Sequence, residues 1–301
     1  MKIWGLRRTF SFVIMDGKSI SAKILNDLKD EISSLKMKNY TSSVPTLGYL
    51  VNSSNAGSFI YYKKKEKTCH SIGIDTIGYD VIGKNDISEL YGHINYLNAN
   101  TAVNGILVQL PIFPGANEAE ILDKVSLEKD IDGLTRKNMG MLFMKNSEPL
   151  FYPCTALGVF ELIKSYGINP RGLHTVIIGR SNLCGLPLFS MFQKANSTVT
   201  MCHTATQNLK QITSQADILV SAAGKANLIR EDMVKDGSIV IDIGINKINT
   251  GEKSLIVGDV DYERVREKTK FITPVPGGVG PMTIAMLLKN LVKAWKRAQN
   301  F

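Results

Sequence analysis

Residues 175–187 read Thr175-Val-Ile-Ile-Gly-Arg-Ser-Asn-Leu-Cys-Gly-Leu-Pro187, and this stretch decides the fold of the second half of the chain. A run of β-branched residues ends at Ile178, a glycine loop follows, and Pro187 suits the first turn of a helix. A strand, a loop and a helix in this order direct backbone N–H groups and the helix dipole toward a phosphate. The loop is not the usual G-x-G-x-x-G, because Ser181 replaces the middle glycine, so the motif alone does not settle the ligand.

Outward from this stretch, segments with strand and helix patterns alternate along the chain, which predicts an α/β protein with parallel sheets. In the first half we expect helices at 19–37, 58–72 and 86–99 and strands at 46–51, 75–79 and 106–109. After the break at Pro153-Cys-Thr155 we expect a helix to Tyr166, strands at 175–178, 198–201, 218–221 and 238–243, and a last helix at 284–298. The second half therefore predicts a Rossmann-type, doubly wound nucleotide-binding domain.

Length and composition bound the class of protein. The 301 residues suffice for two domains with sizeable cores, and 44% hydrophobic with 21% charged residues is typical of a soluble globular protein. No apolar run approaches the ~20 residues that span a bilayer. Four widely spaced cysteines without a CxxC pair indicate reduced thiols in an intracellular protein. Because no His/Cys/Asp cluster has ligand spacing, no metal is implied.

The formal charge of +9 includes basic runs at 63–67 and 289–297. Nucleic-acid binding is one interpretation, but aromatic residues are not interleaved with these runs as a stacking platform requires. Small polyanions, such as a dinucleotide phosphate or a polyglutamylated cofactor, fit as well, and solvated surface lysines are the ordinary alternative. Near the N-terminus, Lys2, Arg7 and Arg8 suggest a mitochondrial presequence or a plain extension, so we expect a cytoplasmic protein with a mitochondrial alternative.

Two segments carry candidate chemistry in the first half. Tyr61 and Lys65 stand four residues apart, on one face of a predicted helix, where an aromatic ring and a proton-transfer group can meet one ligand. The same spacing is common on surface helices. Gln109 is a polar residue at the carboxyl end of a predicted strand, where ligands of α/β sheets gather, although an end-of-strand amide can also bond only to backbone. The Asp130-Ile-Asp132 turn fits Asx-turn chemistry or the binding of an aminopyrimidine edge.

Two further segments suggest ligand-binding loops in the second half. Residues 273–283 contain three glycines and three prolines, so we expect a shaped loop without regular helix or strand, suited to a flat polar ring or serving only as a stiff turn. The strand at 198–201 is followed by His203 and Thr204 without the acid that NAD-selective folds usually place there. Arg180 and Thr204 can instead bind a 2′-phosphate, which favours NADP; His203 alone is more typical of a structural histidine.

Together these motifs resemble the bifunctional methylenetetrahydrofolate dehydrogenase/cyclohydrolase family. The resemblance rests on Ser58-x-x-Tyr61-x-x-x-Lys65, on Gly105–Pro111 and Lys129–Gly133, on Gly179-Arg-Ser-x-x-x-Gly185-x-Pro187, and on the 273–283 loop. It covers residues 14–298. It implies NADP-dependent oxidation of 5,10-methylenetetrahydrofolate to the methenyl cation and hydrolysis of that cation to 10-formyltetrahydrofolate, in the one-carbon metabolism that serves purine biosynthesis.

The resemblance also implies the domains, the partners and the site residues. It places residues 1–155 with 284–301 in a folate-binding catalytic domain and 156–283 in an NAD(P)-binding domain, with a homodimer formed through the latter and no nucleic acid or membrane as partner. Lys65 would be the catalytic lysine, oriented by Gln109, with Tyr61 stacking on the pterin and Asp132 anchoring it. The wider substrate site would add Val108, Leu110, Pro276, Gly277 and Gly278. The dinucleotide site would comprise Gly179, Arg180, Ser181, Gly185, His203, Thr204, Ala223, Gly244, Ile245 and Thr283.

The chain departs from the family pattern at two places. Val51-Asn52 stands where the family has Val-Gly, followed by what looks like a one-residue insertion, and Ala156 replaces the second proline of Pro-Cys-Thr-Pro. We expect these changes to affect local loop shape and substrate affinity rather than the class of reaction.

Overall fold

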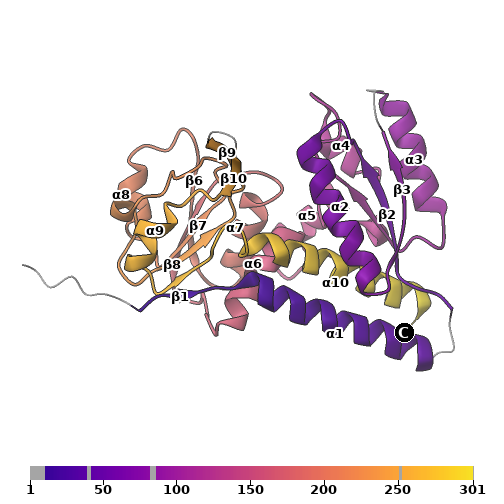
Figure 1. Ribbon diagram of the computed structural model, residues 1–301, viewed down its shortest axis with the longest axis horizontal. Helices are drawn as coiled ribbons and strands as arrows, with labels where there is room; N and C mark the ends of the chain where they lie inside the picture. Colours follow the sequence, from indigo (N-terminus) through magenta and orange to yellow (C-terminus); the bar gives the residue numbers. More distant parts are fainter. Residues whose placement is uncertain (1–10, 39–41, 82–85, 251–252, 301) are drawn as a thin grey trace, which may run out of the picture. The chain divides into compact units, whose positions relative to one another are not determined.

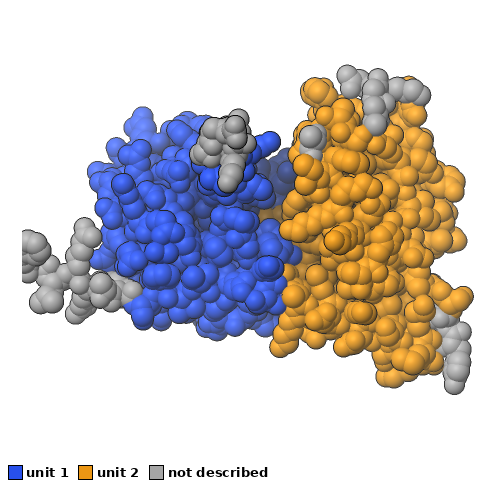
Figure 2. All heavy atoms as spheres, viewed as in Figure 1, with its two compact units in different colours: residues 1–20, 158–282 blue, residues 21–157, 283–301 orange. Residues whose placement is uncertain are grey.

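The computed structural model describes residues 11–38, 42–81, 86–250 and 253–300. The chain forms two compact units, shown in blue and orange in Figure 2. Unit 1 contains Met1–Ile20 and Gly158–Met282, and unit 2 contains Ser21–Leu157 and Thr283–Phe301. Within the described ranges, no helix has both the length and the apolar character needed to cross a membrane.

Unit 1 is built on a six-stranded parallel sheet with the order β1-β11-β8-β7-β5-β6. The strands are β1 (Val13–Ile14), β5 (His174–Ile178), β6 (Thr198–Cys202), β7 (Ile218–Ser221), β8 (Ile239–Asp242) and β11 (Phe271–Ile272). From β5 the chain goes outward to β6 and then returns to β7 on the other side of β5. The sheet is therefore doubly wound, with its switch point between β5 and β7.

The central strands of this sheet are buried along their whole length and mostly apolar, as expected for a parallel sheet covered on both faces. Every residue of β7 and β8 is buried, and Val176, Leu219 and Val240 belong to one core cluster. The helices of the unit are α6 (Cys154–Ser165), which enters unit 1 at Gly158, α7 (Gly185–Lys194), α8 (Leu209–Thr213) and α9 (Tyr262–Val265). An antiparallel hairpin, β9 (Asn246–Thr250) with β10 (Lys253–Val257), and 3-10 turns at Glu231–Met233 and Arg266–Lys268 complete it.

Unit 2 contains a three-stranded parallel sheet in the order β3-β2-β4, formed by β2 (Thr46–Val51), β3 (Asp75–Asp80) and β4 (Gly105–Val108). Its helices are α1 (Gly17–Lys38), α2 (Ala56–Ser71), α3 (Ile87–Ala99), α4 (Glu118–Leu122), α5 (Arg136–Phe143) and α10 (Val279–Gln299), with a 3-10 turn at Leu127–Lys129. Helices α1 and α10 begin in unit 1 and enter unit 2 at Ser21 and Thr283. Side-chain caps start four of the helices: α2, α3, α4 and α5 begin after Asn55, Asp86, Asn117 and Thr135, whose side chains accept from the backbone N of Ser58, Ser88, Glu120 and Asn138.

Helix α10 supplies much of the core of unit 2. It runs beside α1 (Figure 1), and its buried face, which includes Leu288, Leu291 and Trp295, packs in one cluster with Leu28 and Ile32 of α1. The fit against the sheet is tight at Gly105, where an added Cβ would lie 2.4 Å from Ile131 Cγ2 and 2.9 Å from Leu291 Cδ1. The last helix of the chain thus packs against β4 and the turn that contains Asp132.

The structure corrects two expectations. The N-terminal segment was expected in the catalytic domain, but β1 pairs with β11, and the described residues 11–20 belong to unit 1. Helix α10 begins at Val279, inside the segment expected to lack regular structure. Gly280 and Pro281 are tolerated there because the N–H groups of a first helical turn have no intrahelical partner to lose.

Candidate active site and dinucleotide site

Lys65 is the centre of the candidate active site in unit 2. It lies on α2, its side chain is only 6% exposed, and its Nζ donates to Gln109 Oε1 at 3.0 Å. The same Nζ lies 4.9 Å from the centroid of the Tyr61 ring. The i, i+4 spacing on α2 therefore brings an aromatic ring and an amine together, and the end of a neighbouring strand supplies the amide that holds the amine.

Burial changes the acidity of this amine. Loss of solvation lowers the pKa of Lys65, and the negative charge of Asp132 opposes that shift only in part. A lysine with a lowered pKa can both donate and accept a proton near neutral pH. Neighbouring Lys63 and Lys64 are exposed, and Lys63 forms an ion pair with Glu66 at 2.8 Å. Lys65 is thus distinguished from the other lysines of its helix by its surroundings.

Gln109 follows directly after β4, and its backbone N donates to Leu50 O at 2.9 Å. Its side chain is 9% exposed, so strand pairing and burial together fix the amide that faces Lys65. The two residues that flank it, Val108 and Leu110, were also predicted to contact substrate. Val108 buries its side chain in the core cluster on the α3 face of the sheet, which leaves only its main chain for a substrate contact. Leu110 is partly buried against the same cluster, and its carbonyl accepts from Ser58 Oγ at 3.4 Å.

The two aspartates of the 129–133 turn have separate roles. The carboxylate of Asp130 is buried and accepts from Leu134 N, from Thr135 N at 2.9 Å and from Asn138 Nδ2 at 2.7 Å. Asp130 therefore fixes the shape of the turn. Asp132 is only half-buried, and its charge acts on the amine of Lys65. Of the two, Asp132 is the one available to a ligand.

Asn290 and Cys154 also hold this site, and sequence reasoning did not single them out. Asn290 on α10 is buried, and its Nδ2 donates to Ile131 O at 2.8 Å and to Tyr152 O at 3.1 Å. The Cys154 thiol donates to Ile131 O at 3.3 Å, and burial raises the pKa of that thiol well above its usual value. A buried amide inside the apolar face of α10 was the available signal, because such a group needs partners.

The two departures from the family pattern leave well-formed local structure. Asn52 is buried, its Nδ2 donates to Ile112 O at 2.7 Å, and its Oδ1 accepts from Ser54 N at 3.1 Å. The amide thus ties the loop after β2 to the chain that follows Gln109. Ala156 is fully buried in the first turn of α6, so that helix forms without the second proline.

The loop from Gly179 to Gly185 in unit 1 lies at the switch point of the sheet. Gly179 has a φ of 112°, and an added Cβ would stand 2.3 Å from Ala222 O. At Gly185 an added Cβ would stand 2.1 Å from Gly179 O. Only glycines allow three main-chain segments to come this close. As a result, α7 begins at the carboxyl edge of the sheet. The arrangement fits a dinucleotide phosphate at the start of a helix.

Polar groups for the rest of a dinucleotide follow the neighbouring strands. Arg180 and Ser181 are exposed in the β5–α7 loop, and Ser181 Oγ accepts from Cys184 N at 3.2 Å. After β6, Thr204 is exposed, whereas His203 is half-buried and its Nδ1 accepts from Ala205 N at 3.3 Å. His203 therefore shapes its own turn. No group of three or more His, Cys, Asp or Glu side chains that could hold a metal ion occurs in the described parts of the chain.

The remaining predicted residues divide between the units. Ala223 and Ile245 are exposed at the carboxyl ends of β7 and β8, on the same edge as the β5–α7 loop, and Gly244 is buried beside Ile245. Pro276, Gly277 and Gly278 lie in unit 1, where Gly277 O accepts from Lys18 N at 2.9 Å. Thr283, expected with the dinucleotide site, belongs to unit 2, where its Oγ1 lies 3.5 Å from Thr155 Oγ1.

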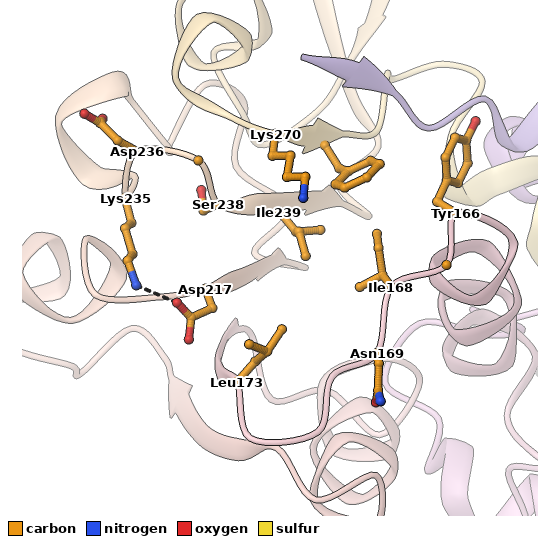
Figure 3. Close-up of a pocket in the computed structure, with 13 residues that line it drawn as sticks. Tyr166, Ile168, Asn169, Leu173, Asp217, Lys235, Asp236, Ser238, Ile239 and Lys270 are labelled. Atoms are coloured by element: carbon orange, nitrogen blue, oxygen red, sulfur yellow. Dashed lines mark hydrogen bonds and ion pairs between the residues drawn. The ribbon is translucent and has the colours of Figure 1, made fainter. Parts of the chain in front are cut away.

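Unit 1 also contains a cavity of about 420 Å³ at the opposite, amino-terminal edge of its sheet (Figure 3). Asp217 and Lys235, which form an ion pair at 2.5 Å, and Lys270 lie around an apolar floor that includes Ile239 and Phe271. These residues precede or begin β7, β8 and β11, whereas the loops described above follow the strands. The cavity is thus separate from the dinucleotide site, which lies at the carboxyl edge.

Comparison with known proteins places this geometry in a family. Residues 15–132 match the catalytic domain of tetrahydrofolate dehydrogenase/cyclohydrolase, and residues 153–299 match its NAD(P)-binding domain. The bifunctional protein FolD of Campylobacter hominis is 46% identical over 283 residues, which cover 94% of this chain and 97% of that protein. FolD of Rickettsia canadensis is 47% identical over 283 residues, with 94% and 96% covered.

Solved structures agree with the sequence matches. The Campylobacter jejuni FolD methylenetetrahydrofolate dehydrogenase/cyclohydrolase superposes with a TM-score of 0.88 at 43% identity, covering 96% of this chain and 99% of that one. The Trypanosoma brucei enzyme, solved with NADP and an inhibitor, superposes with a TM-score of 0.92 at 33% identity and the same coverage. With both domains matched and near-complete coverage by such relatives, the chain belongs to the tetrahydrofolate dehydrogenase/cyclohydrolase family.

Proposed function

We propose that this protein oxidises 5,10-methylenetetrahydrofolate with NADP⁺ and then hydrolyses the methenyl product to 10-formyltetrahydrofolate. The observation that carries the proposal is the buried Lys65 amine, held 3.0 Å from Gln109 Oε1 beside the Tyr61 ring. Family membership and relatives named for both activities support it. A buried amine does not stabilise an apolar core, so a catalytic role explains its presence there.

The oxidation asks the protein mainly for alignment. Bound NADP⁺ would supply the hydride acceptor, and loss of hydride from the substrate is driven by the lone pair of its own nitrogen. On this chain, Tyr61 would stack on the pterin and the half-buried carboxylate of Asp132 would accept hydrogen bonds from the aminopyrimidine edge. Main-chain groups of Val108 and Leu110 would add further contacts. Holding reactants in a fixed geometry is a large part of catalysis for such a step.

The hydrolysis asks for proton transfer. Water adds to the methenyl carbon and loses one proton. The bond from that carbon to the adjacent nitrogen then breaks as the nitrogen is protonated, and the second proton of the water is released to solvent as the formyl carbonyl forms. Lys65 would receive and return the first proton, since burial lowers the pKa of its amine. Gln109 accepts a hydrogen bond from Lys65 through its Oε1, so it would hold the amine in place while the proton moves.

Replacement of Lys65 by methionine tests this role. The variant keeps an unbranched side chain but loses the amine, so we expect cyclohydrolase activity on supplied methenyltetrahydrofolate to fall by about 10²–10⁴-fold. Some NADP-dependent oxidation should survive, because that step depends on alignment. The control is Lys64→Met, which removes an exposed amine from the adjacent position of α2. If the Lys65 variant clears methenyltetrahydrofolate as fast as the parent, the catalytic assignment is wrong.

The same pair of variants gives a pH-dependent stability difference. Because the pKa of Lys65 is lower in the folded protein than in the unfolded chain, the folded state binds fewer protons, and the buried amine costs stability below the ordinary lysine pKa. This cost disappears as pH rises toward that ordinary value. We expect Lys65→Met to be more stable than the parent in urea unfolding at pH 7, with the gain shrinking at higher pH. Lys64→Met should show no such trend, and an equal trend in both would contradict the explanation.

The choice of cofactor is proposed from the exposed cation of Arg180 and the hydroxyl of Thr204, next to β5 and β6. A charge-assisted hydrogen bond to a 2′-phosphate contributes roughly 1.5–3 kcal/mol. We therefore expect a much higher kcat/KM with NADP⁺ than with NAD⁺. We expect Arg180→Ala to lower the ratio of these two kcat/KM values by about one to two orders of magnitude. Arg171→Ala, an exposed arginine ahead of β5, serves as the control. Equal kcat/KM for both cofactors in the parent would refute the proposal.

We further propose a homodimer formed through unit 1. Strand β6 is at the edge of its sheet, and Ile245, Leu255 and Ile256, at the start of the hairpin and within it, are 61%, 49% and 52% exposed. An open strand edge and exposed apolar side chains favour self-association. Light scattering should give a mass of about twice 33.2 kDa, and Ile256→Asp should lower it, whereas Met37→Asp on unit 2 should not. A parent monomer at micromolar concentration would contradict this.

The cellular location stays a prediction. We propose a cytoplasmic protein, with the mitochondrial alternative that Lys2, Arg7 and Arg8 suggest, and those residues lie outside the described part of the chain. The four cysteines are free thiols, and Cys69, Cys154 and Cys202 are buried, which supports a reducing compartment.

A further inference from the structure

Asp259 is a fully buried carboxylate that accepts five hydrogen bonds in unit 1. It follows β10, and its two oxygens lie at the carboxyl edge of the sheet, next to the ends of β7 and β8. Oδ2 accepts from Ser221 Oγ at 3.0 Å, Ala223 N at 2.7 Å and Gly224 N at 3.2 Å, and Oδ1 accepts from Lys225 N and Asn246 Nδ2, both at 2.9 Å. One side chain thus fixes three consecutive backbone amides of the loop after β7.

A second buried carboxylate supports the first. Asp242, the last residue of β8, accepts from Gly244 N at 2.9 Å, from Asp259 N at 3.0 Å and from Val260 N at 2.9 Å. Asp242 therefore holds the main chain of Asp259 in place and also shapes the loop after β8. Burial raises the pKa of Asp242 to about 6, so the carboxylate is mostly ionised at pH 7 and above and can accept all three bonds.

Two glycines allow these carboxylates to reach the backbone. An added Cβ at Gly244 would stand 2.1 Å from Asp259 Oδ1, and one at Gly258 would stand 1.9 Å from Asp242 Oδ2. Neither glycine has the positive φ that would otherwise explain it. The glycines are needed for close approach, so the local sequence is organised around the two carboxylates.

The loops that Asp259 and Asp242 hold lie on one side of the switch point. Strand order places β7 and β8 on one side and β5 and β6, with Arg180 and Thr204, on the other. A dinucleotide bound across the crevice of a doubly wound sheet lays one half over each side. With its 2′-phosphate beside Arg180, the other half, which carries the hydride-accepting ring, lies over the loops after β7 and β8.

We propose that Asp259 is a positioning residue that, supported by Asp242, sets the loops at 222–225 and 243–246 for the ring-bearing half of the dinucleotide. The inference rests on the proposed NADP-dependent oxidation. It assigns Asp259 no contact with the cofactor. Its carboxylate acts through the amides of Ala223, Gly224 and Lys225, three residues that are exposed after β7.

The test is Asp259→Asn. The new side chain has the same shape, but whichever way it turns, its NH₂ group faces at least two donors that the carboxylate accepted. The matched control is Asp261→Asn, two residues later, where the carboxylate lies 3.6 Å from Arg264 Nε and bonds to neither loop. Cyclohydrolase activity on supplied methenyltetrahydrofolate needs no hydride acceptor and comes from unit 2, so it reports whether the rest of the protein is intact.

We expect Asp259→Asn to raise the KM for NADP⁺ at least about tenfold and to lower the kcat of oxidation, because a small misplacement of the ring is costly. The KM for NAD⁺ should rise by the same factor, which leaves the preference for NADP⁺ unchanged, whereas Arg180→Ala changes that preference. Cyclohydrolase activity and the folate KM should remain at the parent values, as should all constants of Asp261→Asn.

Three outcomes would overturn the proposal or its basis. A lower melting temperature with unchanged KM values would show that Asp259 is only structural. A change confined to NADP⁺ would place its influence on the 2′-phosphate side instead. Absence of NADP⁺-dependent oxidation in the parent itself would contradict the proposed function. If Asp259→Asn also loses cyclohydrolase activity, Ser221→Ala carries the same test, since it removes one of the five donors and leaves the carboxylate in place.

Discussion

The buried amine of Lys65, hydrogen-bonded to Gln109, is the constraint around which unit 2 is arranged. An ammonium in an apolar interior is unfavourable unless nearby groups accept hydrogen bonds from it or carry an opposite charge. Strand β4 ends where its next residue can accept the bond, and the 129–133 turn brings a carboxylate whose charge partly offsets the burial. The tight contact of Gly105 with Ile131 and Leu291 fixes the distance between that strand, that turn and α10.

Much of this arrangement could be predicted from the sequence, because it depends on local patterns. The buried run at 46–51 and the i, i+4 pair on α2 follow from periodicity and spacing. Gln109 was identifiable as a polar residue at the end of an apolar strand. The order strand, glycine loop, helix at 175–187 likewise indicated a phosphate-binding turn, and the structure shows the close main-chain approach that requires Gly179 and Gly185.

What the sequence did not reveal depends on contacts between distant segments. Asp259 is 34 to 38 residues from the hydroxyl at the end of β7 and the amides after β7 that it binds, and Asn290 is 159 residues from Ile131. No spacing rule connects such residues, although a charged or amide side chain inside a buried run is a sign that a partner exists elsewhere. The pairing of β1 with β11 also joins distant segments. In addition, a two-residue strand has too short a pattern to be recognised in the sequence.

The buried carboxylates of Asp242 and Asp259 in unit 1 and the buried amine of Lys65 in unit 2 differ in how firmly their neighbours hold them, and the difference matches the chemistry assigned to each unit. In unit 1, the buried carboxylates of Asp242 and Asp259 accept several hydrogen bonds each, mostly from backbone amides, and these bonds fix the loops after β7 and β8. In unit 2, the Lys65 amine donates to Gln109 and has a half-buried aspartate nearby, and burial lowers its pKa, so its proton is held less firmly. A hydride transfer needs fixed geometry, whereas hydrolysis needs a proton that can move. Burial lowers the pKa of Lys65, and it also makes the folded protein less stable than it would be with an apolar residue at position 65. The property that allows proton transfer at this position is therefore the same property that reduces stability.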